Sequence, residues 1–116
     1  MVILTKNDIL KADDTQTVTV SVPEWGGDVI ISSMTGFARD QFEASLVGKN
    51  GGQNISNIRA KLAAATIVDE KGNLMFSEKD LAKLGSKSAA ALDRVFEAAQ
   101  KLNRITEQDV EDLAGN

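Results

Sequence analysis

The chain has 116 residues, of which 42% are hydrophobic and 26% are charged, and its net charge is −4. This balance predicts one globular domain over residues 1–116 and argues against general disorder, and the scattered basic residues argue against binding to nucleic acid. The sequence contains no cysteine and no histidine, which excludes disulfide bonds, thiolate or imidazole metal ligands and the commonest general base.

The first predicted element is a short helix over about Lys6 to Lys11. Thr5 followed three residues later by Asp8 is an N-cap pattern, and Ile9 and Leu10 supply the apolar side. Terminal segments are poorly ordered unless other elements hold them. We therefore expect this helix to be loosely held.

A β-hairpin is predicted next. Val18 to Val22 alternates apolar and polar residues, which indicates a strand with one buried face. Pro23 cannot donate to a sheet ladder, so it should close this strand or lie on a sheet edge. Gly26 and Gly27 allow the positive φ of a reversal, and Asp28 to Ser32 returns as the second strand. An isolated hairpin is marginal in water, so this one must pack on other elements or pair with another chain.

The rest of the chain is predicted to be mainly helical. Apolar spacing and cap residues predict helices over about Gly36 to Val47, Asn54 to Ala65 and Lys87 to Leu102. A short helix is also predicted after the N-cap pattern of Ser77 and Asp80, ending at Gly85, and a final short helix from Thr106. The helix over Lys87 to Leu102 has the strongest periodicity. Ala63 to Ala65 make one side of their helix thin, so a neighbouring element can approach it closely.

A second small hairpin is predicted between Thr66 and Phe76, with its turn at Asp69 to Asn73. The predicted fold class is therefore α+β. An N-terminal β-hairpin and a second small hairpin pack with four to five helices, and the C-terminal half is mainly helical.

The sequence has no recognisable catalytic, metal or cofactor pattern. No GxSxG, Ser-x-x-Lys or HExxH motif occurs, so an enzyme is not expected and no catalytic residue is assigned. The glycine-rich loop Gly48 to Asn54 departs from the Walker pattern, and the acidic turn after Asp69 departs from the calcium-loop pattern. We expect no cofactor and no metal. No stretch approaches the length of a membrane span, so no membrane partner is expected either.

Trp25, at the predicted hairpin tip, is the first residue to test for binding. An exposed Trp is enriched in interface hot spots. Packing of this side chain back onto the helices is the alternative, because Trp is highly buried on average. The free edges of the hairpin could also pair between subunits. The predicted class is thus a binding or assembly module.

Several stretches of the chain are similar to one protein family. They are Pro23-Glu24-Trp25-Gly26-Gly27, Thr35-Gly36, the turn VDEKGN and the segment from Leu84-Gly85 to Leu102-Asn103. Over about Leu4 to Asp112 the sequence resembles the tail assembly chaperones of long, non-contractile-tailed bacteriophages and their prophage relatives. These motifs are architectural and contain no catalytic residues.

The resemblance implies a non-enzymatic protein that binds the tape measure protein and helps to recruit tail tube subunits. It implies action in the cytoplasm of the bacterial host, absence from the mature virion, and self-association in a spiral. In many of these phages a frameshift also produces a second, C-terminally extended form. We expect the interaction residues in the hairpin and the helix after it: Pro23, Trp25, Gly26, Gly27, Phe37 and Arg39.

Two other classes stay open from the sequence. A structural tail component, such as a terminator or connector protein, would remain in the mature virion, whereas a chaperone would not. A small regulatory or antitoxin-like protein is the third class, and the missing basic face disfavours direct DNA binding by it.

Overall fold

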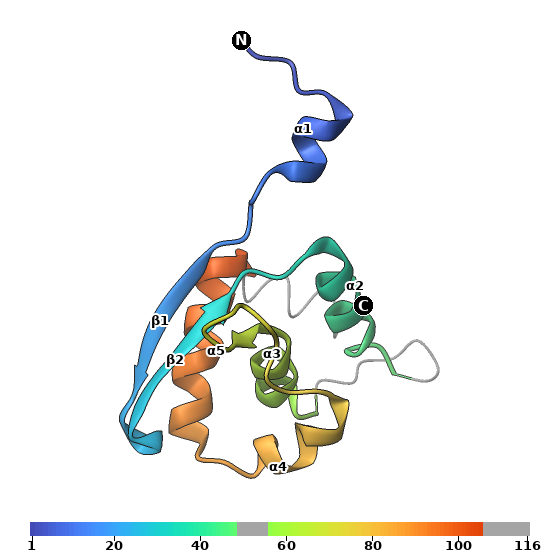
Figure 1. Cartoon of the computed structure of the whole chain (residues 1–116). Helices are drawn as coiled ribbons and strands as arrows, with labels where there is room; N and C mark the ends of the chain where they lie inside the picture. Colours follow the sequence, from blue (N-terminus) through green and yellow to red (C-terminus); the bar gives the residue numbers. More distant parts are fainter. Residues whose placement is uncertain (49–55, 106–116) are drawn as a thin grey trace.

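The computed structural model describes residues 1–48 and 56–105, and it confirms an α+β fold (Figure 1). A three-stranded antiparallel sheet has the strand order β1-β2-β3. The elements in chain order are α1 (Lys6–Lys11), β1 (Thr17–Val22), the 3-10 turn η1 (Pro23–Trp25), β2 (Gly27–Ser32), α2 (Gly36–Ala44), α3 (Ile58–Thr66), β3 (Ile67–Val68), the 3-10 turn η2 (Glu78–Asp80), α4 (Leu81–Gly85) and α5 (Ala89–Asn103).

The first hairpin forms as predicted. In its register Val20 pairs with Val29, and Val22 pairs with Gly27. The turn η1 connects the strands, and Gly26 closes it with a φ of 77° and a backbone N–H that donates to the Pro23 carbonyl at 3.0 Å. A residue with a Cβ would be strained at that φ, so glycine is required for this reversal.

The second small hairpin is present in reduced form and joins the same sheet. Its first strand is β3, but the predicted second strand, Leu74 to Phe76, is only an isolated bridge at Leu74. β3 pairs with β2, and the chain then turns back so that Val68 bridges to Leu74. The Asp69 carboxylate holds the turn, because it accepts the backbone N–H groups of Lys71 at 2.8 Å and Asn73 at 3.0 Å. Aspartate favours turns through this kind of local bond.

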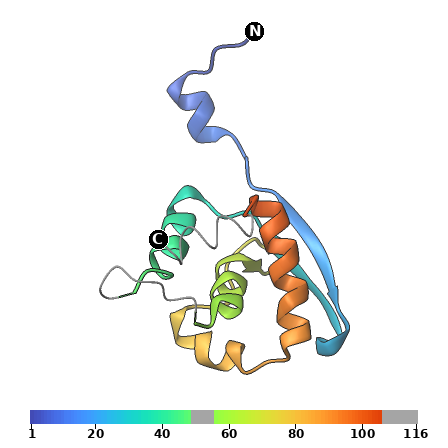
Figure 2. The same ribbon diagram turned by 180° about the vertical axis from the view of Figure 1, so that it is seen from behind.

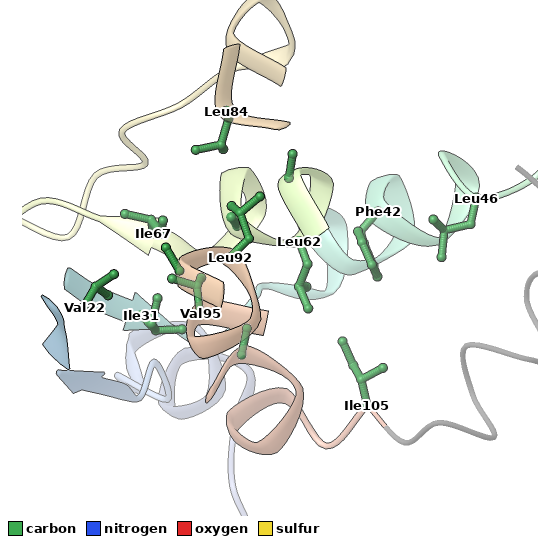
Figure 3. Packing of buried hydrophobic residues seen from close by; sticks show 14 residues of the cluster. Val22, Ile31, Phe42, Leu46, Leu62, Ile67, Leu84, Leu92, Val95 and Ile105 are labelled. Atoms are coloured by element: carbon green, nitrogen blue, oxygen red, sulfur yellow. The ribbon is translucent and has the colours of Figure 1, made fainter. Parts of the chain in front are cut away.

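The core lies between the sheet and the helices. Helix α5 lies along β1 and β2 and also contacts α3, which in turn contacts α2 and α4 (Figures 1 and 2). The predicted stripe of α5 faces this core: Leu92, Val95 and Ala99 are buried, and Phe96 and Leu102 pack against them in part. Figure 3 shows Val95 of α5 beside Ile31 of the hairpin, and Leu92 of α5 near Leu62 of α3.

Three helices depart from their predicted bounds. Helix α5 runs over Ala89–Asn103 and not over Lys87 to Leu102, because Ser88 is its N-cap. Helix α2 ends at Ala44 and not at Val47, and the Ser45 hydroxyl donates to the Phe42 carbonyl at 2.6 Å. Helix α3 begins only at Ile58, because Asn57 has a φ of 59° in the left-handed region. Asparagine visits that region more readily than most residues, but a helix cannot continue through it. The predicted final helix from Thr106 and most of the loop Gly48 to Asn54 lie outside the described residues.

The N-terminal segment stands apart from the rest of the chain. We call residues 1–11 the arm and residues 17–48 and 56–105 the body. Figures 1 and 2 both show the arm extending away from the body. The arm contains α1, and none of the residues of α1 is buried. Within the described ranges, no helix has both the length and the apolar character that a membrane crossing requires.

Candidate protein-interaction surfaces

The sequence-predicted interaction residues do not form one surface. Pro23, Trp25, Gly26 and Gly27 lie at the hairpin tip, at one end of β1 and β2. Phe37 and the rest of α2 follow the opposite end of β2 (Figure 1). The hairpin and α2 must therefore be treated as two separate candidate surfaces.

At the hairpin tip, Trp25 is half-buried and packs against the hydrophobic core. The two alternatives for Trp25, packing on the helices and exposure to a partner, therefore each hold in part. The surface of Trp25 that stays uncovered lines a groove of about 420 Å³. We call this the Trp25 groove. Its other lining residues come from the segment that leads into α4 and from α4 itself, together with the residue that opens the next loop: Phe76, Asp80, Lys83, Leu84 and Lys87.

The charge at the Trp25 groove is mainly basic. The Asp80 carboxylate accepts the backbone N–H of Ser77 at 2.9 Å in a capping box, so it is already engaged in η2. Lys83 and Lys87 are exposed at the same groove. An apolar floor with two lysines suits an amphipathic helix whose polar flank is acidic.

An ion pair ties the hairpin tip to α5. Arg94 Nε lies 2.9 Å from Glu24 Oε1, and the hydrogen bond from Arg94 lowers the pKa of the Glu24 carboxyl below its ordinary value. Because Glu24 belongs to η1, this contact holds the turn against the helix beneath it. Trp25 follows Glu24 directly in the chain, so this ion pair helps to fix where the Trp25 side chain lies.

The two candidates in α2 have different roles. Phe37 is 73% exposed, so its ring is available to a partner. Arg39 is engaged within the body, since its Nε lies 3.1 Å from Glu43 and its Nη1 donates to the Asn103 carbonyl at 2.8 Å. The side chain of Asn103 also accepts the Met34 backbone N–H at 2.6 Å. Arg39 thus joins α2 to the end of α5, and Phe37 is the freer residue of the pair.

A second groove, which the sequence did not identify as a site, lies between α2, α3 and the segment 74–81. We call it the Ala64 groove, and its volume is about 340 Å³. Alanines line it from α2 and α3, and larger apolar side chains complete it: Ala38, Ala64, Ala65, Phe42, Leu74, Phe76 and Leu81. Its polar lining is Gln41, Ser45, Lys61, Ser77 and Glu78. The signal in the sequence was the run Ala63 to Ala65, of which Ala63 is buried while the two that follow are half-buried.

The arm is the third uncovered apolar region. Its exposed hydrophobic side chains are Met1, Val2, Ile3, Leu4, Ile9 and Leu10. The sequence shows these residues, but only the structure shows that the body covers none of them. Among the described residues no group of three or more His, Cys, Asp or Glu side chains is placed to hold a metal ion. The Trp25 groove, the Ala64 groove and the arm are apolar surfaces, and they suit a macromolecular partner.

Comparisons with known proteins support the resemblance at the level of fold. No protein-family model matches the chain, and no curated protein matches it. Among solved structures, the bacteriophage HK97 tail assembly chaperone is similar with a TM-score of 0.60 and 18% sequence identity. The match covers 87% of this chain and 95% of that chain. The similarity to this family that the sequence motifs predict is therefore confirmed as a shared fold.

Proposed function

We propose that this protein is a phage tail assembly chaperone that binds the tape measure protein and helps to recruit tail tube subunits during tail morphogenesis. The observation that carries the proposal is the fold shared with the HK97 chaperone over nearly the full length of both chains. We place this activity in the cytoplasm of the bacterial host and expect the protein to be absent from the mature virion. The role is non-enzymatic and involves neither nucleic acid nor a membrane.

A physical need for such a protein follows from the client. A tape measure protein is long and largely helical, and it exposes apolar stripes until the tail tube encloses it. Uncovered apolar patches of that size invite aggregation. A small protein that offers an apolar groove can cover one section of such a helix, and many copies in a spiral can cover the rest.

The Trp25 groove is the surface that we assign to this client. Its floor contains Trp25, Phe76 and Leu84, which can accept the apolar face of an amphipathic helix. Lys83 and Lys87 would attract acidic residues on the flanks of that helix. One groove makes a weak contact, but many linked contacts along one client give strong overall binding. A frameshift-extended form, where the gene encodes one, would share this groove and carry its additional contacts beyond it.

Co-expression with the tape measure protein of the same genome tests this function. We expect the wild-type protein to keep the tape measure protein soluble and to co-purify with it. The double variant Lys83→Glu/Lys87→Glu should lose most of this binding, because it reverses the charge at the groove without changing the core. Lys71→Glu/Lys101→Glu is the matched control, since it makes the same change of charge at two exposed positions outside the groove.

Three outcomes would contradict the proposal at different levels. If the tape measure protein aggregates equally with and without the wild-type protein, the chaperone function is wrong. If both double variants bind as the wild type does, the function stands and the Trp25 groove is the wrong surface. If mass spectrometry finds the protein in mature particles, it is a structural tail component such as a terminator or connector protein.

A further inference from the structure

The arm carries apolar residues that its own body leaves uncovered. Leu4 is 60% exposed, Ile9 is 58% exposed and Leu10 is 72% exposed. The first two stand at the N′ and N4 positions about the Thr5 cap, where hydrophobic residues commonly pack against each other. Their high exposure leaves one side of this pair open, so the arm has an apolar face without a cover in the described part of the chain.

The hydrogen bonds within the arm are too few to keep α1 folded by themselves. Helix α1 has six residues, and isolated helices of that length are marginal in water. The chain leaves the body at Gln16, whose backbone N–H donates to Ser33 Oγ at 2.9 Å and whose carbonyl accepts the Ser33 N–H at 2.8 Å. This pair of bonds fixes the point of departure at the end of the sheet, and the arm points away from there (Figures 1 and 2).

Charge distinguishes between the Trp25 groove and the Ala64 groove as sites for the arm. The arm has two lysines, Lys6 and Lys11, against one aspartate, Asp8, whose carboxylate is engaged by the Thr5 N–H. The lysines of the Trp25 groove would repel this basic segment. The Ala64 groove is lined by one lysine and one glutamate and so lacks this net positive charge.

The two charges that line the Ala64 groove, Lys61 and Glu78, balance each other, so a basic segment is not repelled there as it is at the Trp25 groove. Lys61 keeps its positive charge, and its Nζ donates to the Ser45 carbonyl at 3.0 Å, which holds the ammonium group at the body. The Glu78 carboxylate has no ion-pair partner among residues 1–48 and 56–105. Half-buried alanines on α3 leave room for a helix to approach closely, and Leu74, at 54% exposure, is an uncovered apolar contact at the groove.

We propose that the arm of one copy docks into the Ala64 groove of a second copy. The apolar side chains of α1 enter the groove, and a lysine of the arm approaches Glu78. Because the arm and the groove are different surfaces, each copy can give one arm and receive another, and such head-to-tail contacts form open chains unless the rotation closes them into a ring. The inference rests on the proposed function, in which many copies act together, and it names the surfaces by which they associate.

Engineered cysteines give a direct test, because the chain has no native cysteine. Full-length Leu10→Cys protein is mixed with full-length Ala65→Cys protein under mild oxidation. A disulfide-linked heterodimer is expected in high yield. Ala90→Cys replaces Ala65→Cys in the control, since Ala90 is an exposed alanine of α5 that lines neither groove. Equal cross-linking of both pairs would overturn the proposal.

Sedimentation of variants tests the same contact without cross-links. Ile9→Glu/Leu10→Glu in the arm and Ala65→Arg in the groove should each weaken self-association by about tenfold or more. An equimolar mixture of the two retains one intact arm and one intact groove, so it should form heterodimers and nothing larger. The controls are Asn7→Glu in the arm and Ala90→Arg in α5, which should associate as the wild type does.

The arm variant cannot fail through misfolding of the core, because none of the residues of α1 is buried. The proposal is wrong if the wild type stays monomeric, if the arm variant assembles as the wild type does, or if the mixture forms no heterodimer. None of these measurements uses the tape measure protein. Loss of client solubility with intact assembly would instead contradict the proposed function and leave the arm contact standing.

Discussion

Helices α1 and α5 begin in the same way but are stabilised differently. Each starts at a hydroxyl residue that accepts a backbone N–H, Thr5 from Asp8 at 3.2 Å and Ser88 from Ala91 at 3.3 Å. Helix α1 then buries none of its residues, whereas α5 buries four. The cap defines where each helix starts, but only α5 gains the free energy of apolar burial.

Within the described part of the chain, helix α1 is held only by bonds within its own segment, whereas α5 is held by packing against distant segments. The order of α1 is local, so changes in the arm should leave the unfolding of the body unaffected. The order of α5 is part of the core that includes the hairpin and α3 (Figure 3). The same substitution should therefore have different consequences in the arm and in the body.

The largest difference is expected for leucine. Leu62 of α3 is fully buried, and Leu62→Ala should lower the free energy of unfolding by about 2–5 kcal/mol through lost burial and an unfilled cavity. Leu10→Ala, in the exposed arm, should change it by less than about 0.5 kcal/mol. Urea unfolding followed by circular dichroism measures both. Equal effects would show that the arm packs on the body.

Asparagine gives the second test. Asn103→Ala removes the acceptor of the Met34 N–H and should cost about 1–3 kcal/mol, because a part-buried donor then loses its partner. Asn7→Ala, at an exposed position of α1, should have an effect within about 0.5 kcal/mol. The same urea titration compares them. A neutral Asn103→Ala would mean that water replaces the side chain at this junction.

The caps of α1 and α2 give the third test. Thr5→Ala should remove about 1 kcal/mol of local helix stability, and hydrogen exchange of the α1 amides should speed up while the unfolding of the body stays unchanged. Thr35 caps α2 in the same way, by accepting the Ala38 N–H at 3.0 Å. Since α2 is packed through Phe42, Thr35→Ala should instead lower the global unfolding free energy. A global effect of Thr5→Ala would contradict the separation of the two regions.

The smallest effect is expected from pH. The Thr5 backbone N–H holds the pKa of Asp8 below its ordinary value of 3.8. A lowered pKa in the ordered state means that this contribution is present above pH 3.8 and is lost as the pH falls through the lowered value. Hydrogen exchange should therefore show α1 fraying in acid. Asp8→Asn removes this titration, so persistence of the same pH dependence in that variant would assign it to another group.

The elements that the sequence predicted well are those with local signals. The bounds of α1 and the end of α4 at Gly85 agree with the predicted ones, and the first hairpin closes at Gly26 as its positive φ requires. The predicted cap at Ser77 opens the 3-10 turn η2, and α4 follows it. A cap, a turn glycine and an alternating strand involve neighbours within a few residues, so one sequence displays them. The shortened start of α3 was missed because the left-handed φ of Asn57 has no unique signature in the sequence.

The candidate site was predicted less completely. Trp25 and Phe37 were proposed as interaction residues of one stretch, but the sequence left the exposure of Trp25 open and placed Phe37 beside the apolar stripe of its helix. The structure half-buries Trp25, exposes Phe37 and puts the two residues at opposite ends of β2. Arg39 was proposed as an interaction residue, and its partner proves to be a carbonyl 64 residues away in the chain. The proposed roles of the remaining tip residues, Pro23 and the two glycines, stay predictions.

The sequence by itself determined the α+β composition, the caps of α1 and α2, the hairpin and the absence of cysteine and histidine chemistry, because these depend on residue types and on short spacings. Only the tertiary structure decided that β3 joins β2, that the Trp25 ring both packs and lines a groove, and that the arm is left uncovered. Burial depends on which distant segments meet. The spacing within an amphipathic helix predicts an apolar face, but it does not say whether the same chain or another one will cover it.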